Sequence, residues 1–287
     1  MIELLQTNTY FLIGATAVLG LLIGSFLNVV IYRLPIMMES SWTAQCRELL
    51  ELEAPQDAEK ENEPFNLIKP SSRCPHCGHK IGALENIPVF SYILQKGKCR
   101  ACSKPISTRY PIIELVTGIL SAVVVWQLGF SWGALCGLIF TWAMIALTMI
   151  DFDHQLLPDD ITLPLVWFGL LLSLVPVFAS TSDAIIGACA GYLSLWLVFH
   201  LFKLITGKEG MGYGDFKLFA LFGAWFGWQC LPVVLLLSSV VGAVVGITLI
   251  VIKGRDRNIP IPFGPYLAGA GWIYLLWGEA IVDAYLG

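Results

Sequence analysis

The sequence predicts an all-α protein that crosses a membrane about eight times and carries a cytoplasmic zinc-knuckle insert. Of its 287 residues, 56% are hydrophobic and only 13% are charged. Soluble domains carry roughly 25% charged residues, so this chain has too few charges to solvate a globular surface. The bilayer must therefore serve as part of its solvent. The lengths of the apolar runs and the distribution of charge then set the number of spans and their direction.

The apolar runs can be divided by length, because a helix needs about 20 residues to cross a bilayer. Two runs predict one span each, and they cover residues 10–32 and about 263–287. Three longer runs predict two spans each, and they cover residues 111–150, 161–205 and 216–252. Their breaks are expected at small or polar residues near 129–133, 181–183 and 229–232. The total is eight spans.

The distribution of charge supports this count. Eight spans place all 17 Lys and Arg residues on one side of the membrane. By the positive-inside rule that side is cytoplasmic, so both termini face outward, which is the periplasm in a bacterial inner membrane. The outer side carries only acids, which are Glu3, Asp183, Glu279 and Asp283. The first run has no basic residue ahead of it, so we do not expect a cleaved signal peptide.

We therefore expect three parts: a first transmembrane helix (1–34), a cytoplasmic insert (35–110) and a seven-helix membrane domain (111–287). The insert has two halves of opposite charge. Residues 38–64 hold eight acids, and residues 71–109 hold seven basic residues against the single acid Glu85. A short helix is expected at 41–52 and a polar linker at 55–64. This composition makes the lipid bilayer an expected partner, and no nucleic-acid partner is expected.

Two C-x-x-C pairs in the insert predict a metal site. Each pair presents two thiolates from one tight turn, and two such turns complete a tetrahedron. The four cysteines are Cys74, Cys77, Cys99 and Cys102. The cytoplasm is reducing, which favours a structural zinc over disulfides, and a redox dithiol pair is the alternative. Gly78 and Gly97 flank the pairs as tight turns often require, and His76 and His79 are expected to be bystanders rather than ligands.

Acids beside apolar spans are costly and need an explanation. Asp151 ends the third predicted span, and Asp215 follows the run Gly210-Met-Gly-Tyr-Gly214 at the start of the sixth. The topology places both at the cytoplasmic interface, where they can meet. Two close carboxylates share one proton, so one can activate water while the other polarises a peptide carbonyl. The pair therefore suggests aspartic-protease chemistry.

Plainer explanations exist for several acids. Asp159 and Asp160 follow Leu-Pro and are expected to be an N-cap and a first-turn acid of the next helix. Asp153 is expected to be solvated at the interface, and Asp215 could itself be only an N-cap. The Gly-x-Gly-x-Gly pattern is weak evidence for nucleotide binding because it follows a membrane helix and not a strand.

Taken together, these segments resemble the bifunctional type IV prepilin peptidases, the prepilin leader peptidase/N-methyltransferases of Gram-negative type IV pilus and type II secretion systems. The matching segments are Gly24-Ser-Phe-Leu-Asn-Val-Val-Ile-Tyr-Arg-Leu-Pro35, both C-x-x-C pairs with Glu85-Asn-Ile-Pro88 between them, Tyr110-Pro-Ile-Ile-Glu114, the Asp151 segment and Gly212-Tyr-Gly-Asp215. The resemblance implies that Asp151 and Asp215 are the catalytic aspartates of a Gly-x-Gly-Asp aspartyl peptidase.

The resemblance also implies the reaction. The substrates would be prepilins and pseudopilins with a short basic leader, cut at the cytoplasmic face and then N-methylated from S-adenosylmethionine. No nucleotide-binding fold is apparent, so Glu85 and Asn86 in the insert are the expected methyl-donor site, with Glu114 a further candidate. A non-enzymatic scaffold and a proton-coupled transporter remain alternatives, although a transporter would place its acids nearer the bilayer midplane.

Overall fold

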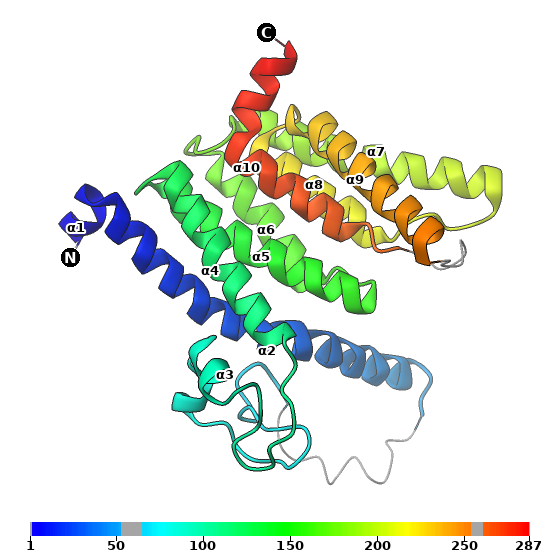
Figure 1. Cartoon of the computed structure of the whole chain (residues 1–287). Coiled ribbons are helices and arrows are strands. Elements are labelled where there is room, and N and C mark those ends of the chain that lie inside the picture. Colours follow the sequence, from blue (N-terminus) through cyan, green and yellow to red (C-terminus); the bar gives the residue numbers. More distant parts are fainter. Residues whose placement is uncertain (1, 53–64, 254–260, 287) are drawn as a thin grey trace. The chain divides into compact units, whose positions relative to one another are not determined.

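The structure is a computed structural model that describes residues 2–52, 65–253 and 261–286 (Figure 1). The described residues form helices and turns without a β-strand, and two isolated antiparallel bridges occur in the cysteine-rich segment. The all-α prediction is confirmed. The predicted polar linker at 55–64 lies outside the described residues.

The chain divides into two compact units, Met1–Trp126 and Gln127–Gly287. The first unit contains α1 (Ile2–Thr7), α2 (Thr9–Leu49), the short 3-10 helix η2 (Ala83–Asn86), α3 (Phe90–Leu94) and nearly all of α4 (Arg109–Leu128). The second unit contains α5 (Trp132–His154), α6 (Asp159–Leu172), α7 (Thr181–Thr206), α8 (Tyr213–Phe226), α9 (Cys230–Lys253) and α10 (Gly264–Leu286). The boundaries predicted at residues 34 and 110 stay predictions.

Helix α2 is longer than the first predicted span. It begins at the N-cap Asn8, whose side chain accepts a hydrogen bond from the Phe11 backbone N–H at 3.0 Å, and it continues for 41 residues. Pro35 lies inside it and supplies no N–H for the helical ladder, and Figure 1 shows a change of direction along this helix. Residues 41–49 are helical as expected, but as a continuation of α2 and not as a separate helix.

Glycines bring α2 and α4 into backbone contact. A methyl group built on Gly20 would lie 2.8 Å from the Cα atom of Gly118, and one on Gly24 would lie 2.7 Å from the Cα atom of Glu114. Small residues at a helix crossing allow this close approach inside a membrane. The crossing sets Ser25, which follows Gly24, beside the first turns of α4.

In the second unit, α8 is the central helix and packs against α6, α7, α9 and α10 (Figure 1). Every residue from Asp215 to Phe226 except Lys217 is buried. Its end is held by Trp225, whose indole N–H donates to the Leu165 carbonyl at 2.8 Å and whose ring packs on Phe140. Asp215 at the start of α8 is therefore carried by the most enclosed helix of this unit.

Each of the eight predicted spans coincides with one of the helices α2 and α4–α10. Five of them, α2, α4, α5, α7 and α9, are long and apolar enough to cross a bilayer. The protein is thus a multi-pass membrane protein. Helices α6 and α8 have 14 residues each, which corresponds to about 21 Å at 1.5 Å per residue, less than the ~30 Å hydrocarbon core. The count of eight spans therefore stays a prediction.

Candidate functional site

Asp151 lies in the last turn of α5 and is buried, with 5% of its surface exposed. The helix ends three residues later at His154, where Gln155 adopts a left-handed conformation and its N–H donates to the Asp151 carbonyl at 2.9 Å. The chain then turns inward through the buried residue Leu157. A carboxyl group is thus held inside the second unit at a helix end.

Asp215 lies in the first turn of α8 and is also buried, with 6% of its surface exposed. It is not the N-cap: Gly212 occupies that position, and the Gly212 N–H donates to Oδ2 of Asp215 at 3.2 Å. The Asp215 N–H in turn donates to the Gly212 carbonyl at 3.2 Å. These two bonds fix the direction of the side chain as in a capping box.

The two carboxyl groups belong to one site. The charge of Asp151 acts on Asp215, and Leu157 packs against a residue next to each of them. A methyl group built on Gly264, the first residue of α10, would lie 2.6 Å from Oδ2 of Asp151 and 3.1 Å from Cδ2 of Leu157. One built on Gly214, beside Asp215, would lie 2.7 Å from Cβ of Leu157. The ends of α5, α8 and α10 therefore converge around the same leucine.

One oxygen of this site has no hydrogen bond of standard geometry. Oδ2 of Asp151 is buried and lacks such a bond to any described residue, and the Gly264 backbone N–H faces the same carboxyl. Buried polar atoms are nearly always hydrogen-bonded, and exceptions commonly mark functional positions. Two neighbouring buried carboxyls can share one proton, with the ionised member accepting a proton from water and the protonated member polarising a carbonyl. Paired carboxyls of this kind carry out the hydrolysis of peptide bonds in aspartic proteases.

Two other acids near the site, Asp159 and Asp160, have structural roles at the start of α6. Helix α6 starts at Asp159 with Pro158 as its N-cap, so the predicted N-cap role of Asp159 or Asp160 is wrong, and both are first-turn acids. Proline supplies the cap position because its fixed φ suits the entry to a helix. Asp159 accepts from Nζ of Lys217 at 2.7 Å through both oxygens. This ion pair ties the first turns of α6 and α8 together.

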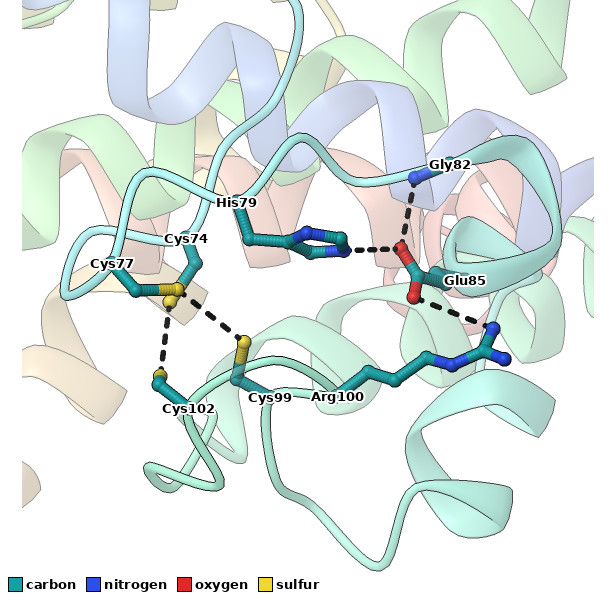
Figure 2. A network of polar contacts seen from close by, with 8 residues as sticks. All are labelled: Cys74, Cys77, His79, Gly82, Glu85, Cys99, Arg100 and Cys102. Carbon is teal, nitrogen blue, oxygen red and sulfur yellow. Dashed lines mark hydrogen bonds and ion pairs between the residues drawn. The ribbon is translucent and has the colours of Figure 1, made fainter.

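The four cysteines of the insert lie together in the first unit (Figure 2). Their sulfur atoms are all within 4.8 Å of one another, and the Cys74–Cys102 and Cys77–Cys99 sulfurs are 3.9 Å apart. A tetrahedral zinc with bonds of about 2.3 Å requires sulfur separations of about 3.8 Å. The four-cysteine cluster therefore fits zinc in both ligand type and spacing.

The two turns that carry these cysteines are built alike. Cys74 N–H donates to the His79 carbonyl at 2.9 Å, and Cys99 N–H donates to the Lys104 carbonyl at 2.8 Å. Gly78 follows the first pair with a φ of 72°, as a tight turn requires. Ser103 occupies the matching place after the second pair with a φ of 59°, so a serine takes the left-handed position in that turn. Gly97 precedes the second pair instead.

Backbone N–H groups favour the thiolate form of these cysteines, which is the form that binds a cation. Those of His76 and Cys77 lower the pKa of Cys74 to about 6, and those of Cys102 and Ala101 lower the pKa of Cys99. The His79 N–H acts in the same sense on Cys77, yet burial and the three neighbouring sulfurs raise the Cys77 pKa to about 12. Adjacent thiolates repel one another, and a bound cation removes that repulsion.

Glu85 connects the two turns (Figure 2). Its Oε2 accepts from the Gly82 N–H at 3.0 Å and lies 3.1 Å from Nε2 of His79, while Oε1 lies 3.8 Å from the guanidinium of Arg100. The Gly82 hydrogen bond and the His79 ring lower the pKa of Glu85. Asn86 next to it is exposed. His79 thus contacts a carboxylate, in keeping with its predicted role outside the ligand set.

Glu114 is a buried acid of the first unit, with 8% of its surface exposed. Its Oε2 accepts from the Val89 N–H at 2.8 Å, and its carboxyl also bonds the Ser25 hydroxyl. Val89 has a φ of 60° and a ψ of −48°, a strained conformation for a β-branched residue. Glu114 therefore fastens a strained turn of the insert to α2 and α4.

The sequence predicted Asp151, Asp215 and the cysteines as site residues, and it did not point to Leu157, Gly264 or the partner of Asp159. The run Ile-Pro-Phe-Gly264-Pro at the start of the last span could have indicated that another group approaches the backbone there. A glycine between a bulky residue and a proline at a helix start often permits a close approach. Its partner, however, is more than a hundred residues away in the sequence.

Fold and site define a multi-pass helical membrane protein with a buried aspartate pair in one unit and a four-cysteine cluster in the other. Residues 18–128 match the bacterial peptidase A24 N-terminal domain, and residues 138–247 match the type IV leader peptidase family. The chain belongs to the family of prepilin leader peptidase/N-methyltransferases, as three relatives named "Prepilin leader peptidase/N-methyltransferase" establish.

The relative from Stutzerimonas stutzeri is 56% identical over 99% of this chain and 97% of its own length. That from Aeromonas hydrophila is 54% identical over 100% of this chain and 98% of its own length, and that from Pseudomonas aeruginosa is 52% identical over 100% and 97%. No solved structure matches the chain.

Proposed function

We propose that the protein removes the leader peptide of type IV prepilins and of type II secretion pseudopilins, and then methylates the new N-terminal residue. The observation that carries the proposal is the buried Asp151–Asp215 pair, one oxygen of which lacks a hydrogen bond of standard geometry. The names of the relatives support prepilins as substrates and methylation as the second activity.

Hydrolysis by this pair needs no covalent intermediate. The ionised aspartate takes a proton from a water molecule, whose oxygen attacks the carbonyl carbon of the scissile peptide. The protonated aspartate hydrogen-bonds the carbonyl oxygen as negative charge develops on it. The C–N bond then breaks, and the departing amine takes up a proton. Helices α5, α8 and α10 hold the two carboxyls for these steps.

The charge distribution supports a cytoplasmic site in the inner membrane. All the basic residues are expected on the side of Asp151 and Asp215, with both termini in the periplasm. A prepilin would present its basic leader on that side, drawn by Asp153, Asp159 and Asp160. Asp159 is partly neutralised by Lys217, so the exposed Asp160 carries more of this attraction.

The second activity belongs, in this proposal, to the first unit. Zinc held by the four-cysteine cluster would stabilise the insert, because a closed four-sulfur site leaves no open position for chemistry. S-adenosylmethionine would supply the methyl group to the new amine. Glu85 and Asn86 remain the proposed contacts for it, with the buried Glu114 holding the adjacent turn in place.

The test uses the detergent-solubilised full chain and a prepilin. We expect a shortened product, and a methylated one when S-adenosylmethionine is added. Asp151→Asn and Asp215→Asn should stop shortening but leave methylation of an already shortened pilin intact. An unchanged prepilin after incubation with the folded wild-type chain would contradict the proposal.

A further inference from the structure

The segment of the first unit that joins the two C-x-x-C turns exposes several large apolar side chains. It contains η2 and α3, which pack against each other. We call its exposed apolar residues the α3 patch, and they are Leu84, Ile87, Phe90, Ile93 and Leu94. The exposed fraction reaches 82% at Leu84 and 80% at Leu94. Single apolar residues on a surface are ordinary, but several grouped on one short segment mark a contact with a protein or a membrane.

Helix α3 turns its apolar side outward and a polar group inward. Phe90, Ile93 and Leu94 are spaced three and four residues apart, so they share one face of the helix. Tyr92 lies on another face and is half-buried, and its hydroxyl donates to the Ile106 carbonyl at 3.4 Å within the insert. A surface helix that faced water would carry the reverse pattern. The outer face of α3 is therefore built to lie against something apolar.

The depth of α3 in relation to the membrane follows from its bond to α4. Helix α4 has 20 residues, which correspond to about 30 Å at 1.5 Å per residue and match the hydrocarbon core of a bilayer. Glu114 lies in the second turn of α4, and its Oε2 accepts from the N–H of Val89, the N-cap of α3, at 2.8 Å. Side chains on a helix tilt toward its N-terminus. Val89 thus lies near the membrane boundary, and Phe90 begins α3 at that level.

The charge of the same segment suits a membrane surface. Residues 71–109 hold seven basic residues against the single acid Glu85. Lys96 and Lys98 follow α3 closely in the sequence, and both are exposed. Anionic lipids attract basic residues that are held near the bilayer surface. A partner protein with an apolar face would match the α3 patch alone, whereas lipid matches the patch and the adjoining lysines at once.

We propose that the α3 patch is a lipid-contact surface. Its side chains enter the bilayer beside α4, and the basic residues that follow α3 contact anionic headgroups. Elements that lie in the membrane interface bury their apolar faces about 5–10 Å into the boundary between headgroups and acyl chains. The contact holds the cysteine-rich insert against the membrane. The inference goes beyond the proposed function, because it concerns the place of the insert and needs neither cleavage nor methylation.

A photoreactive probe tests the contact directly. Leu94 is replaced by p-benzoylphenylalanine in the full chain, which is reconstituted into vesicles of equal parts phosphatidylethanolamine and phosphatidylglycerol and then illuminated. We expect mass spectrometry to find lipid attached at residue 94. Phosphatidylglycerol should be captured about fivefold more often than phosphatidylethanolamine, the factor for one basic residue near a charged surface.

The control probe replaces Leu50, which is also exposed and lies at the end of α2 that Figure 1 shows away from α3. It should capture little lipid. Lipid capture that is equal at residues 50 and 94 would overturn the proposal. Attachment of residue 94 only to protein, whether this chain or a second copy, would overturn it as well. Equal capture of the two lipids at residue 94 would refute the contact with anionic headgroups.

A second measurement uses ordinary substitutions in the same vesicles. The double variant Ile93→Gln with Leu94→Gln keeps side chains of similar length but makes the outer face of α3 polar. Amide hydrogen exchange in residues 87–96 should become about tenfold faster or more, because the lost burial of a single Leu accounts for at least that factor. Leu50→Gln is the matched control and should leave this exchange unchanged. Unchanged exchange in the double variant would overturn the proposal.

Discussion

Replacing Gly264 by alanine tests whether the geometry around Asp151 matters for cleavage. The new methyl group would lie 2.6 Å from Oδ2 of Asp151 and 3.1 Å from its Cγ. Carbon–oxygen contacts are normally about 3.3–3.6 Å, so the carboxyl must retreat by about 0.7 Å. Leu157 restricts that movement, because its Cδ2 lies 3.1 Å from the same methyl position. A misplacement of about 1 Å can cost a hundredfold in rate.

We therefore expect Gly264→Ala to lower the rate of leader removal by about 10- to 100-fold. Gly269→Ala is the matched control, since Gly269 lies on the same helix and a methyl group there meets no atom within 4 Å. Both variants are assayed for initial rate in detergent, after size-exclusion chromatography confirms that they are folded. Methylation of an already shortened pilin should be equal in the two. Equal cleavage rates for the two variants would refute this reasoning.

Three further predictions concern the surroundings of the two sites. Cys74→Ser should release zinc, measured by metal analysis, and expose the insert to protease; full zinc content would rule out a four-cysteine site. Glu114→Ala leaves the Val89 N–H unbonded and should destabilise the first unit by about 1–3 kcal/mol in denaturant titrations, whereas unchanged stability would mean the bond is unimportant. Lys217→Met breaks the partly exposed pair with Asp159 and should cost less than about 1 kcal/mol, with cleavage kept within a few-fold; loss of cleavage would show that Lys217 has a larger role.

The features that the sequence predicted are those that a single short segment determines. The apolar runs predicted the helices because a span is a property of one segment, and each predicted span coincides with one helix. The cysteine cluster was predictable because a C-x-x-C pair fixes two ligands within one turn. Asp151 and Asp215 could be identified because charge is rare beside apolar runs.

The features that the sequence did not predict depend on contacts between distant segments or on weak local conformational preferences. Nothing in the sequence shows that Leu157 lies between Gly214 and Gly264, since the three belong to different segments. The extension of α2 beyond Pro35 was missed because a proline usually interrupts a helix, whereas here the helix continues around it. The sequence around Val89 does not indicate its φ of 60°, because its hydrogen-bond partner Glu114 lies 25 residues away in the sequence.

The central claim is that the two buried aspartates perform the hydrolysis. Its most direct test is the rate of leader removal by the Asp215→Asn protein, compared with the wild type in the same detergent and against the same prepilin. Asparagine keeps the shape of the side chain and can still accept the Gly212 N–H through its carbonyl oxygen, so the fold should be retained. We expect the rate to fall by about a thousandfold or more while methylation of a shortened pilin continues. A cleavage rate within about tenfold of the wild type would contradict the account.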